Sequence, residues 1–172
     1  MRDAQKFGYS GRIPTGSDRA VPKKNQKFAI LEPQMKIYII NGPNLNLTGK
    51  REPGIYGNES FEEILRQWKQ NFSKAELHYA QSNIEGEIIN LLQSVPAEAA
   101  GIVLNPGGYS HTSVAIADAI RAVGVPVVEV HMSNIAAREE FRRHSITAAA
   151  CKGVISGFGM KSYELAIKLL SE

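Results

Sequence analysis

The chain has 172 residues, of which 43% are hydrophobic, and this is enough for one domain whose core needs no disulfide or metal. The formal net charge is +3, but residues 1–34 carry seven Lys or Arg against three acids, so the remainder is close to neutral. This distribution argues against a nucleic-acid partner, because phosphate binding needs cations clustered on the folded domain. We expect a disordered basic extension, residues 1–34, before one domain, residues 35–172.

The one cysteine, Cys151, cannot form an intramolecular disulfide and has no Cys or His neighbours at zinc-ligand spacing. No apolar run approaches the ~18 residues of a membrane span, and the first residues lack the apolar core of a secretory signal. These features predict a cytoplasmic protein with no membrane partner. A targeting peptide is the alternative for the basic extension, although an acid as early as Asp3 is unusual in one.

Strands and helices alternate from residue 36 onward. A β-branched run at 36–41 predicts a buried strand, and a loop rich in Gly and Pro, 42–58, follows it. Ser60 and Glu63 form a capping-box pattern, which predicts the start of a helix. The buried face of this helix is predicted to contain Ile64, Leu65 and Trp68.

The same strand and helix unit then repeats. Residues 75–80 predict a second strand, and Ser82 with Glu85 predicts a second capping box. Apolar residues at helical spacing follow in this second helix: Ile84, Ile88, Leu91 and Leu92. A third strand is predicted at 101–105 and a helix at 112–123. The inward residues of that helix are predicted to be Ile116, Ala119, Ile120 and Val123.

A fourth strand is predicted at 127–130, a polar arginine-rich stretch at 133–144, a fifth strand at 153–156 and a last helix at 162–170. This alternation predicts an α/β fold, a flavodoxin-like open five-stranded parallel sheet with helices on both faces. Ligands of such sheets bind beyond the carboxyl ends of the strands. The loops after the first, third and fourth strands are therefore where we expect function.

These three loops contain polar residues suited to binding a small molecule with a carboxylate and hydroxyl groups. They are Asn44 and Arg51, then Asn105 and His111, and finally His131, Ser133 and Arg142. Charge-assisted and neutral hydrogen bonds from such side chains hold a polar ligand in a partly dry site. Because the loops follow strands of one parallel sheet, we expect these side chains to converge.

The loops also contain three long motifs: NGPNLNLTGKREPGIYG from Asn41, LNPGGYSHTSVAIADAI from Leu104 and VPVVEVHMSNIAAREEFRRHS from Val125. In order and spacing they resemble the signatures of the type II 3-dehydroquinate dehydratases. The resemblance extends from about Met35 to the carboxyl terminus. It implies that residues 35–172 form a catalytic domain that removes water from 3-dehydroquinate to give 3-dehydroshikimate through an enolate, without metal or cofactor. Such a reaction serves either aromatic biosynthesis or quinate breakdown.

The resemblance also implies roles for individual residues. Tyr56 matches the proton acceptor, and a phenol of pKa near ~10 needs a cation such as Arg51 to favour its ionised form. Arg51 thereby matches the transition-state stabiliser. His131 matches the proton donor to the leaving hydroxyl, and Glu129, two residues earlier on the same side of a strand, orients or charges it. Asn44 matches a residue that positions a water or the enolate oxygen.

A second set of residues is matched to substrate binding: Asn105, His111, Asp118, Met132, Ser133 and Arg142. The counterpart of Asp118 reaches the active site of a neighbouring subunit, because the family assembles as trimers stacked into dodecamers. Arg138 also matches the family's loop, and we expect it to hold this loop or Tyr56 in place. The sequence departs from the family at Ala136, where His is frequent.

Each of these residues also has an ordinary structural interpretation outside its motif. Tyr56 would be a loop aromatic, Arg51 a solvated loop charge, Arg142 a helix charge paired with Glu139 or Glu140, and His131 a hydrogen-bonded structural residue. The rival classes of protein are a flavin- or phosphate-binding module, a catalytically silent scaffold and a nicotinamide-dependent oxidoreductase. The first loop lacks a phosphate cradle, and the glycines at 157 and 159 lack the remaining fingerprint glycine.

Overall fold

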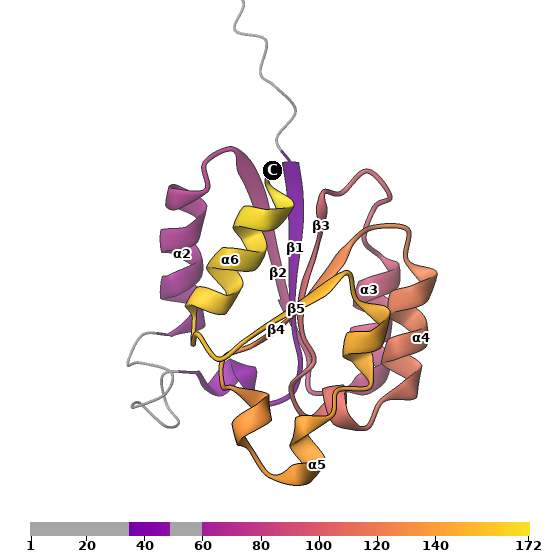
Figure 1. Cartoon of the computed structure of the whole chain (residues 1–172). Helices are drawn as coiled ribbons and strands as arrows, with labels where there is room; N and C mark the ends of the chain where they lie inside the picture. The colour runs from indigo at the N-terminus through magenta and orange to yellow at the C-terminus, as the bar shows by residue number, and fades with distance from the viewer. Residues whose placement is uncertain (1–34, 49–59) are drawn as a thin grey trace, which may run out of the picture. The chain divides into compact units, whose positions relative to one another are not determined.

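The computed structural model describes residues 35–48 and 60–172. Its strands are β1 (Met35–Asn41), β2 (Ala75–Gln81), β3 (Gly101–Asn105), β4 (Val127–His131) and β5 (Gly153–Ser156). They form one parallel sheet in the order β2-β1-β3-β4-β5, with β1 paired to both β2 and β3 (Figure 1). This is the flavodoxin-like strand order, and the predicted fold class is confirmed.

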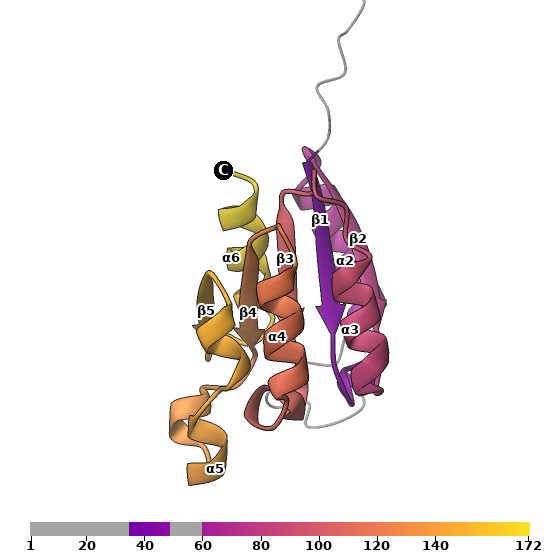
Figure 2. The ribbon, with the colours of Figure 1, turned by 90° about the vertical axis from the view of Figure 1, so that its right-hand side faces the viewer.

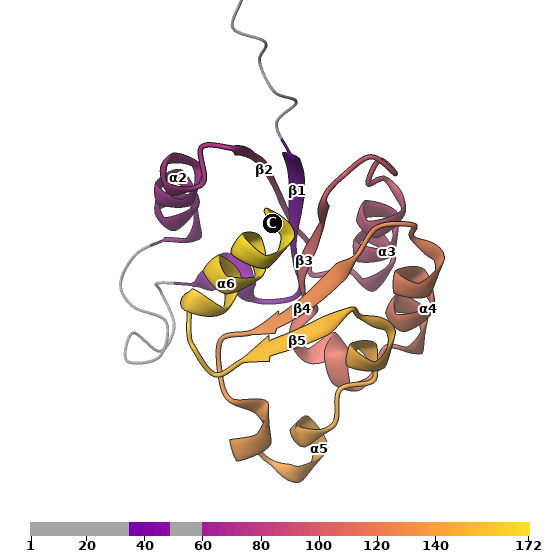
Figure 3. The same ribbon diagram turned by 45° about the horizontal axis from the view of Figure 1, so that its top comes forward.

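Helices cover both faces of the sheet (Figures 1 and 2). One layer contains α2 (Phe61–Asn71) and α6 (Lys161–Leu170), and the other contains α3 (Glu85–Gln93) and α4 (Val114–Ala122). The short helix α5 (Glu140–Arg143) follows β4 in the chain and lies at the bottom of the view in Figure 3. Within the described ranges, no helix has both the length and the apolar character needed to cross a membrane.

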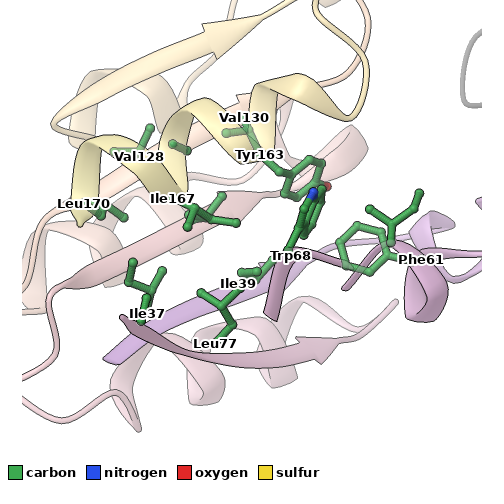
Figure 4. Packing of buried hydrophobic residues seen from close by; sticks show 14 of the residues in the cluster. Ile37, Ile39, Phe61, Trp68, Leu77, Val128, Val130, Tyr163, Ile167 and Leu170 are labelled. Carbon is green, nitrogen blue, oxygen red and sulfur yellow. The ribbon is translucent and has the colours of Figure 1, made fainter. Parts of the chain in front are cut away.

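The core between the sheet and the α2–α6 layer is built around aromatic rings (Figure 4). Trp68 is 1% exposed, and its ring lies 5.5 Å from that of Tyr163 and 5.6 Å from that of Phe61. Its indole Nε1 donates to the Glu164 carboxylate at 3.0 Å, so the polar atom of this buried ring is satisfied. As predicted, α2 directs Ile64 and Trp68 inward, while Leu65 is half-buried at the margin.

The first predicted capping box is confirmed at the start of α2. The Ser60 hydroxyl accepts from the Glu63 amide at 3.3 Å, and the Glu63 carboxylate accepts from the Ser60 amide at 2.9 Å. These two bonds satisfy amide groups that have no partner within the helix. The serine hydroxyl and amide also lower the pKa of Glu63.

The second predicted capping box, Ser82 with Glu85, is wrong. The chain is still extended at Ile84, so α3 begins only at Glu85 and Ser82 lies too far before it to act as its N-cap. The Ser82 hydroxyl instead accepts from the Ile84 amide at 3.0 Å and donates to the carboxylate of Glu87. Ile84 therefore precedes the helix and is 58% exposed.

The helix predicted at 112–123 is shorter, because Ser113 rather than Thr112 is the cap of α4. Its hydroxyl accepts from the Ile116 amide at 2.8 Å and is buried. Thr112 instead follows the 3₁₀ helix η2 (Gly107–His111) that leaves β3, so this turn takes the residues before the cap. Ile116, Ala119 and Ile120 face the core, and Val123 is half-buried.

We expect Ser113→Ala to lower the free energy of unfolding by about 1 kcal/mol, because the first turn of α4 loses a buried acceptor. Urea denaturation of the purified chain measures this change. Ser94→Ala is the control, since the exposed Ser94 hydroxyl donates to the Leu91 carbonyl at the end of a helix. Equal losses of stability in the two variants would contradict the capping role of Ser113.

Candidate active site

A cavity of about 250 Å³ lies beyond the carboxyl ends of the central strands. The strand order reverses between β1 and β3, and the loops that leave these two strands diverge to opposite faces of the sheet. Predicted site residues from all three loops line the cavity: Asn44, Asn105, His111, His131, Met132, Ser133, Arg138 and Arg142. The expected convergence of these described residues is therefore observed.

The loops after β1 and β3 are in direct backbone contact. The Gly42 amide donates to the Asn105 carbonyl at 2.7 Å, and a Cβ at Gly42 would lie only 2.4 Å from the Pro106 carbonyl oxygen. Any larger residue at position 42 would force the two loops apart. Asn44 follows in the left-handed region at φ 68°, which Asn tolerates better than most residues. The main-chain amide of Asn44 donates to Asn83 Oδ1 at 3.0 Å, which fixes this turn at the cavity wall.

The side chain of Asn105 is held from behind by the last helix. Its Nδ2 donates to the Tyr163 hydroxyl at 2.8 Å, and that hydroxyl donates to Asn41 Oδ1 at 2.8 Å. The Asn105 Oδ1 accepts from the Gly107 amide at 3.1 Å. A buried chain of hydrogen bonds thus joins the ends of β1 and β3 to α6, and leaves Asn105 little rotational freedom.

The predicted pairing of Glu129 with His131 is present at the end of β4. His131 Nε2 lies 2.7 Å from Glu129 Oε1, and the two side chains are 7% and 0% exposed. Burial disfavours the charged form of Glu129, but hydrogen bonds from His131, Thr147 and Ser145 outweigh it and lower the carboxyl pKa. Because a carboxylate only accepts, Nε2 of His131 carries a proton and Nδ1 is the nitrogen left for a ligand.

His111 lies across from this pair in the cavity wall. Its Nδ1 donates to the His144 carbonyl at 2.8 Å, because a carbonyl oxygen can only accept. The ring stands 6.4 Å from that of His131 with an interplanar angle of 18°. The loop after β3 and the segment after α5 are joined at this point, with the second imidazole nitrogen of His111 available to a ligand.

Two arginines from the stretch after β4 line the same cavity. Arg138 Nε and Arg142 Nε each lie 3.4 Å from Glu139 Oε2, and both arginines lower the pKa of that carboxyl, whose own backbone amide contributes most. At Arg142 the contact is an ion pair without hydrogen-bond geometry, and the buried Nε has no hydrogen-bond partner among the described residues. Arg142 therefore combines the predicted pairing with Glu139 and a place in the cavity wall.

The remaining predicted residues lie elsewhere. Glu129 stands behind His131 rather than in the cavity wall. Asp118 is exposed on α4, outside the cavity lining, and forms an ion pair with Arg121 at 2.9 Å. Arg51 and Tyr56 fall within residues 49–59, outside the described residues.

Several residues of the site were not predicted from the sequence. The additional cavity lining comes from Pro43, Leu45, Leu47, Thr48, Gly107, Gly108 and Ile135. Tyr163 looks like an ordinary core residue of an amphipathic helix, and no local pattern links it to Asn105. Ser145 ends the third motif and Thr147 follows it, but no local pattern links either hydroxyl to Glu129, which lies 16 and 18 residues earlier. In the part of the chain that the structure describes, no three His, Cys, Asp or Glu side chains are grouped so as to hold a metal ion.

The fold and this cavity define a small-molecule enzyme in which a carboxylate–histidine pair stands at the carboxyl ends of a parallel sheet. The family model "Dehydroquinase class II" matches residues 35–171, and the chain belongs to that family. A 3-dehydroquinate dehydratase of Helicobacter hepaticus is 56% identical over 138 residues, covering 77% of this chain and 86% of the relative. One of Clostridium acetobutylicum is 52% identical over 138 residues, covering 79% and 96%.

Solved structures agree with this assignment. The type II dehydroquinase of Butyrivibrio crossotus superposes with a TM-score of 0.75 at 44% identity, covering 81% of this chain and 99% of that one. The family consists of hydro-lyases, so the predictions of an enzyme and of its reaction class are confirmed.

We expect Tyr163→Phe to lower both stability and turnover. The change leaves Asn105 Nδ2 and Asn41 Oδ1 without the hydroxyl that they share, and an unsatisfied buried polar group costs about 1–3 kcal/mol. The free energy of unfolding and kcat are the two measurements. A variant with the turnover of the parent chain would show that Asn105 needs no support from α6.

Proposed function

We propose that this chain dehydrates 3-dehydroquinate to 3-dehydroshikimate through an enolate. The observation that carries the proposal is the buried Glu129–His131 pair, whose histidine lines one cavity together with Asn44 and Asn105. Family membership supplies the substrate, and the cavity offers an acid, hydrogen-bond donors and two arginines to a hydroxylated carboxylate. The product serves either aromatic biosynthesis or quinate breakdown, since both use the same dehydration.

In the first step, Tyr56 as phenolate removes the proton from the carbon beside the ketone, and the electron pair forms the enolate. Arg51 stabilises the phenolate, and an arginine suits this role because it stays charged when buried. Asn44 positions a water or donates to the enolate oxygen. The left-handed turn at Asn44, pinned by Asn83, supports such a fixed placement.

In the second step, the enolate re-forms the carbonyl and the carbon–oxygen bond to the hydroxyl group breaks. His131 gives its Nδ1 proton to the departing oxygen, which leaves as water. Glu129 stabilises the imidazolium before the transfer, and its lowered pKa supports an ionised form over the neutral range. The proton taken by Tyr56 then returns through solvent to His131, and the enzyme is ready for another cycle.

Substrate binding is assigned to the other residues of the cavity wall. Asn105, His111 and Ser133 hydrogen-bond ring hydroxyls and the carboxylate, while Met132 contributes its main chain. Arg142 donates to the ring hydroxyls, since its buried Nε lacks a hydrogen-bond acceptor among the described residues. Arg138 holds the loop after β4, where its carbonyl accepts from Arg143 Nε at 2.9 Å.

We further propose that the chain assembles as a homododecamer built from trimers, in which Asp118 reaches a neighbouring site. The position of Asp118 supports this role, because the carboxylate is exposed on α4 and lies outside the cavity of its own chain. Exposed apolar side chains such as Val114 on α4 and Leu169 on α6 offer surface for subunit contacts.

The activity can be tested by mixing the purified chain with 3-dehydroquinate and following the ultraviolet absorbance of the conjugated enone product. Growth of this absorbance is the expected result.

We expect Tyr56→Phe to lower kcat by about 10³-fold or more with ligand affinity largely kept, because the base is lost and the cavity is not. His131→Ala should lower kcat by about 10²- to 10⁴-fold, chiefly by slowing departure of the hydroxyl. Near-normal turnover of Tyr56→Phe would rule out its role as the base.

Mixed oligomers test the role of Asp118. Asp118→Asn and His131→Ala chains should each be impaired alone, but reassembly from a mixture should restore activity, because an intact His131 site then receives Asp118 from its neighbour. Light scattering during the assay reports the oligomer. Failure of the mixture to recover activity, or full activity of a monomer, would contradict a role across subunits.

A further inference from the structure

The carboxylate of Glu129 is fully buried, and both of its oxygens are occupied by donors. Oε1 accepts from His131 Nε2 at 2.7 Å and from the Ser145 hydroxyl at 2.7 Å. Oε2 accepts from the Thr147 hydroxyl, and the Cys151 thiol lies 3.9 Å away. Three of these donors come from residues 145–151, far along the chain from β4.

The geometry of Ser145 directs its single proton to this carboxylate. Its Oγ accepts from the Ala148 amide at 3.1 Å, which occupies a lone pair and leaves the O–H to donate. The possible acceptors are Glu129 Oε1 at 2.7 Å, Thr147 Oγ1 at 3.2 Å and the Ser110 carbonyl at 3.4 Å. The shortest of these is the bond to the carboxylate, which is also the strongest because the acceptor is charged.

The same segment is anchored to the opposite wall of the cavity. The Ile146 amide donates to the Ser110 carbonyl at 2.7 Å, and the His144 carbonyl accepts from His111 Nδ1 at 2.8 Å. Residues 144–147 thus touch the loop after β3 on one side and Glu129 on the other. Their position therefore depends on contacts with both walls of the cavity, one that contains His111 and one that contains His131.

We propose that Ser145 and Thr147 are positioning residues of the dehydration, which act through Glu129 on the proton donor His131. The inference rests on the proposed function and adds two residues to it. A hydroxyl pair that donates to a buried carboxylate keeps it ionised and fixes its direction. The ionised carboxylate then favours the imidazolium and turns the ring so that Nδ1 is presented to the leaving hydroxyl.

The charged and titratable groups around Glu129 are consistent with this arrangement. His131 lies beside it on β4, and burial together with Glu129 raises the pKa of Cys151 to about 12, so the thiol stays neutral. His111, Arg138 and Arg142 stand in the cavity wall. Among the described residues, the direct donors to the carboxylate are His131, the two hydroxyls and, at the longer distance of 3.9 Å, the neutral Cys151 thiol.

The direction of the pH effect follows from the lowered pKa of Glu129. In the parent chain Glu129 is ionised above that pKa and becomes protonated as the pH falls through it. Removing a hydroxyl donor raises the carboxyl pKa, so the loss begins at higher pH. The acidic limb of kcat, which we assign to protonation of Glu129, should move upward by about one pH unit.

Substitutions at Thr147 separate this role from packing. Thr147→Val keeps the shape and removes the hydroxyl, whereas Thr147→Ser keeps the hydroxyl and removes a methyl group. We expect Thr147→Val to lower kcat about tenfold with KM within about twofold, and Thr147→Ser to recover most of that loss. Ser145→Ala should resemble Thr147→Val.

Ser113→Ala is the matched control, because it removes a buried hydroxyl from a helix cap outside the cavity and should leave kcat unchanged.

Adding Thr147→Val to a Glu129→Gln chain should cost no further activity, because the carboxylate through which it acts is gone. If Thr147→Ser were the impaired variant and Thr147→Val the normal one, packing would explain the site and the inference would be overturned. An unchanged acidic limb in Thr147→Val would overturn it as well.

A readout without turnover keeps this inference separate from the proposed function. The ¹³C carboxyl resonance of Glu129, identified by its loss in Glu129→Gln, should titrate at higher pH in Thr147→Val than in the parent chain. A parent chain without dehydratase activity would refute the proposed function, while the carboxyl titration would still decide whether the hydroxyls keep Glu129 ionised. Identical titrations in the two chains would overturn the inference whatever the activity.

Discussion

A buried negative charge at Glu129 constrains the end of the sheet where the cavity lies. A carboxylate with no exposed surface is costly unless hydrogen bonds or a cation compensate for it, and here His131, Ser145 and Thr147 do so. These partners come from β4 and from the segment that follows α5. These bonds to one side chain therefore help to hold the chain where it returns to β4 after the arginine-rich stretch.

A second constraint joins the other half of the site to this one. At the reversal of strand order, the approach of Gly42 to Asn105 brings the loops after β1 and β3 together, and Tyr163 ties both strand ends to α6. The segment at residues 144–147 then links the loop after β3 to the surroundings of Glu129 through Ser110 and His111. The cavity thus has walls that are held by backbone and buried side-chain bonds.

The fold could be predicted from the sequence because its signals are local. Five predicted strands alternate with four predicted helices along the chain, and the capping box at Ser60 lies where the pattern indicates it. The same pattern failed at Ser82 because a capping box also needs the backbone to enter the helix at that residue, and the chain is extended until Ile84. The convergence of the polar loops followed from the topology of a parallel sheet rather than from any single residue.

The supporting residues could not be predicted in the same way, because their partners are distant in sequence. Glu129 and His131 are two residues apart on one strand, so their contact follows from strand geometry. Thr147 lies 18 residues from its partner Glu129, and Tyr163 lies 58 residues from Asn105. The sequence around each hydroxyl does not distinguish it from that of an ordinary core residue. Strand spacing therefore places Glu129 beside His131, while the assignment of these residues to the chemistry comes from the family resemblance. The hydroxyls that contact them appear only when the chain is folded.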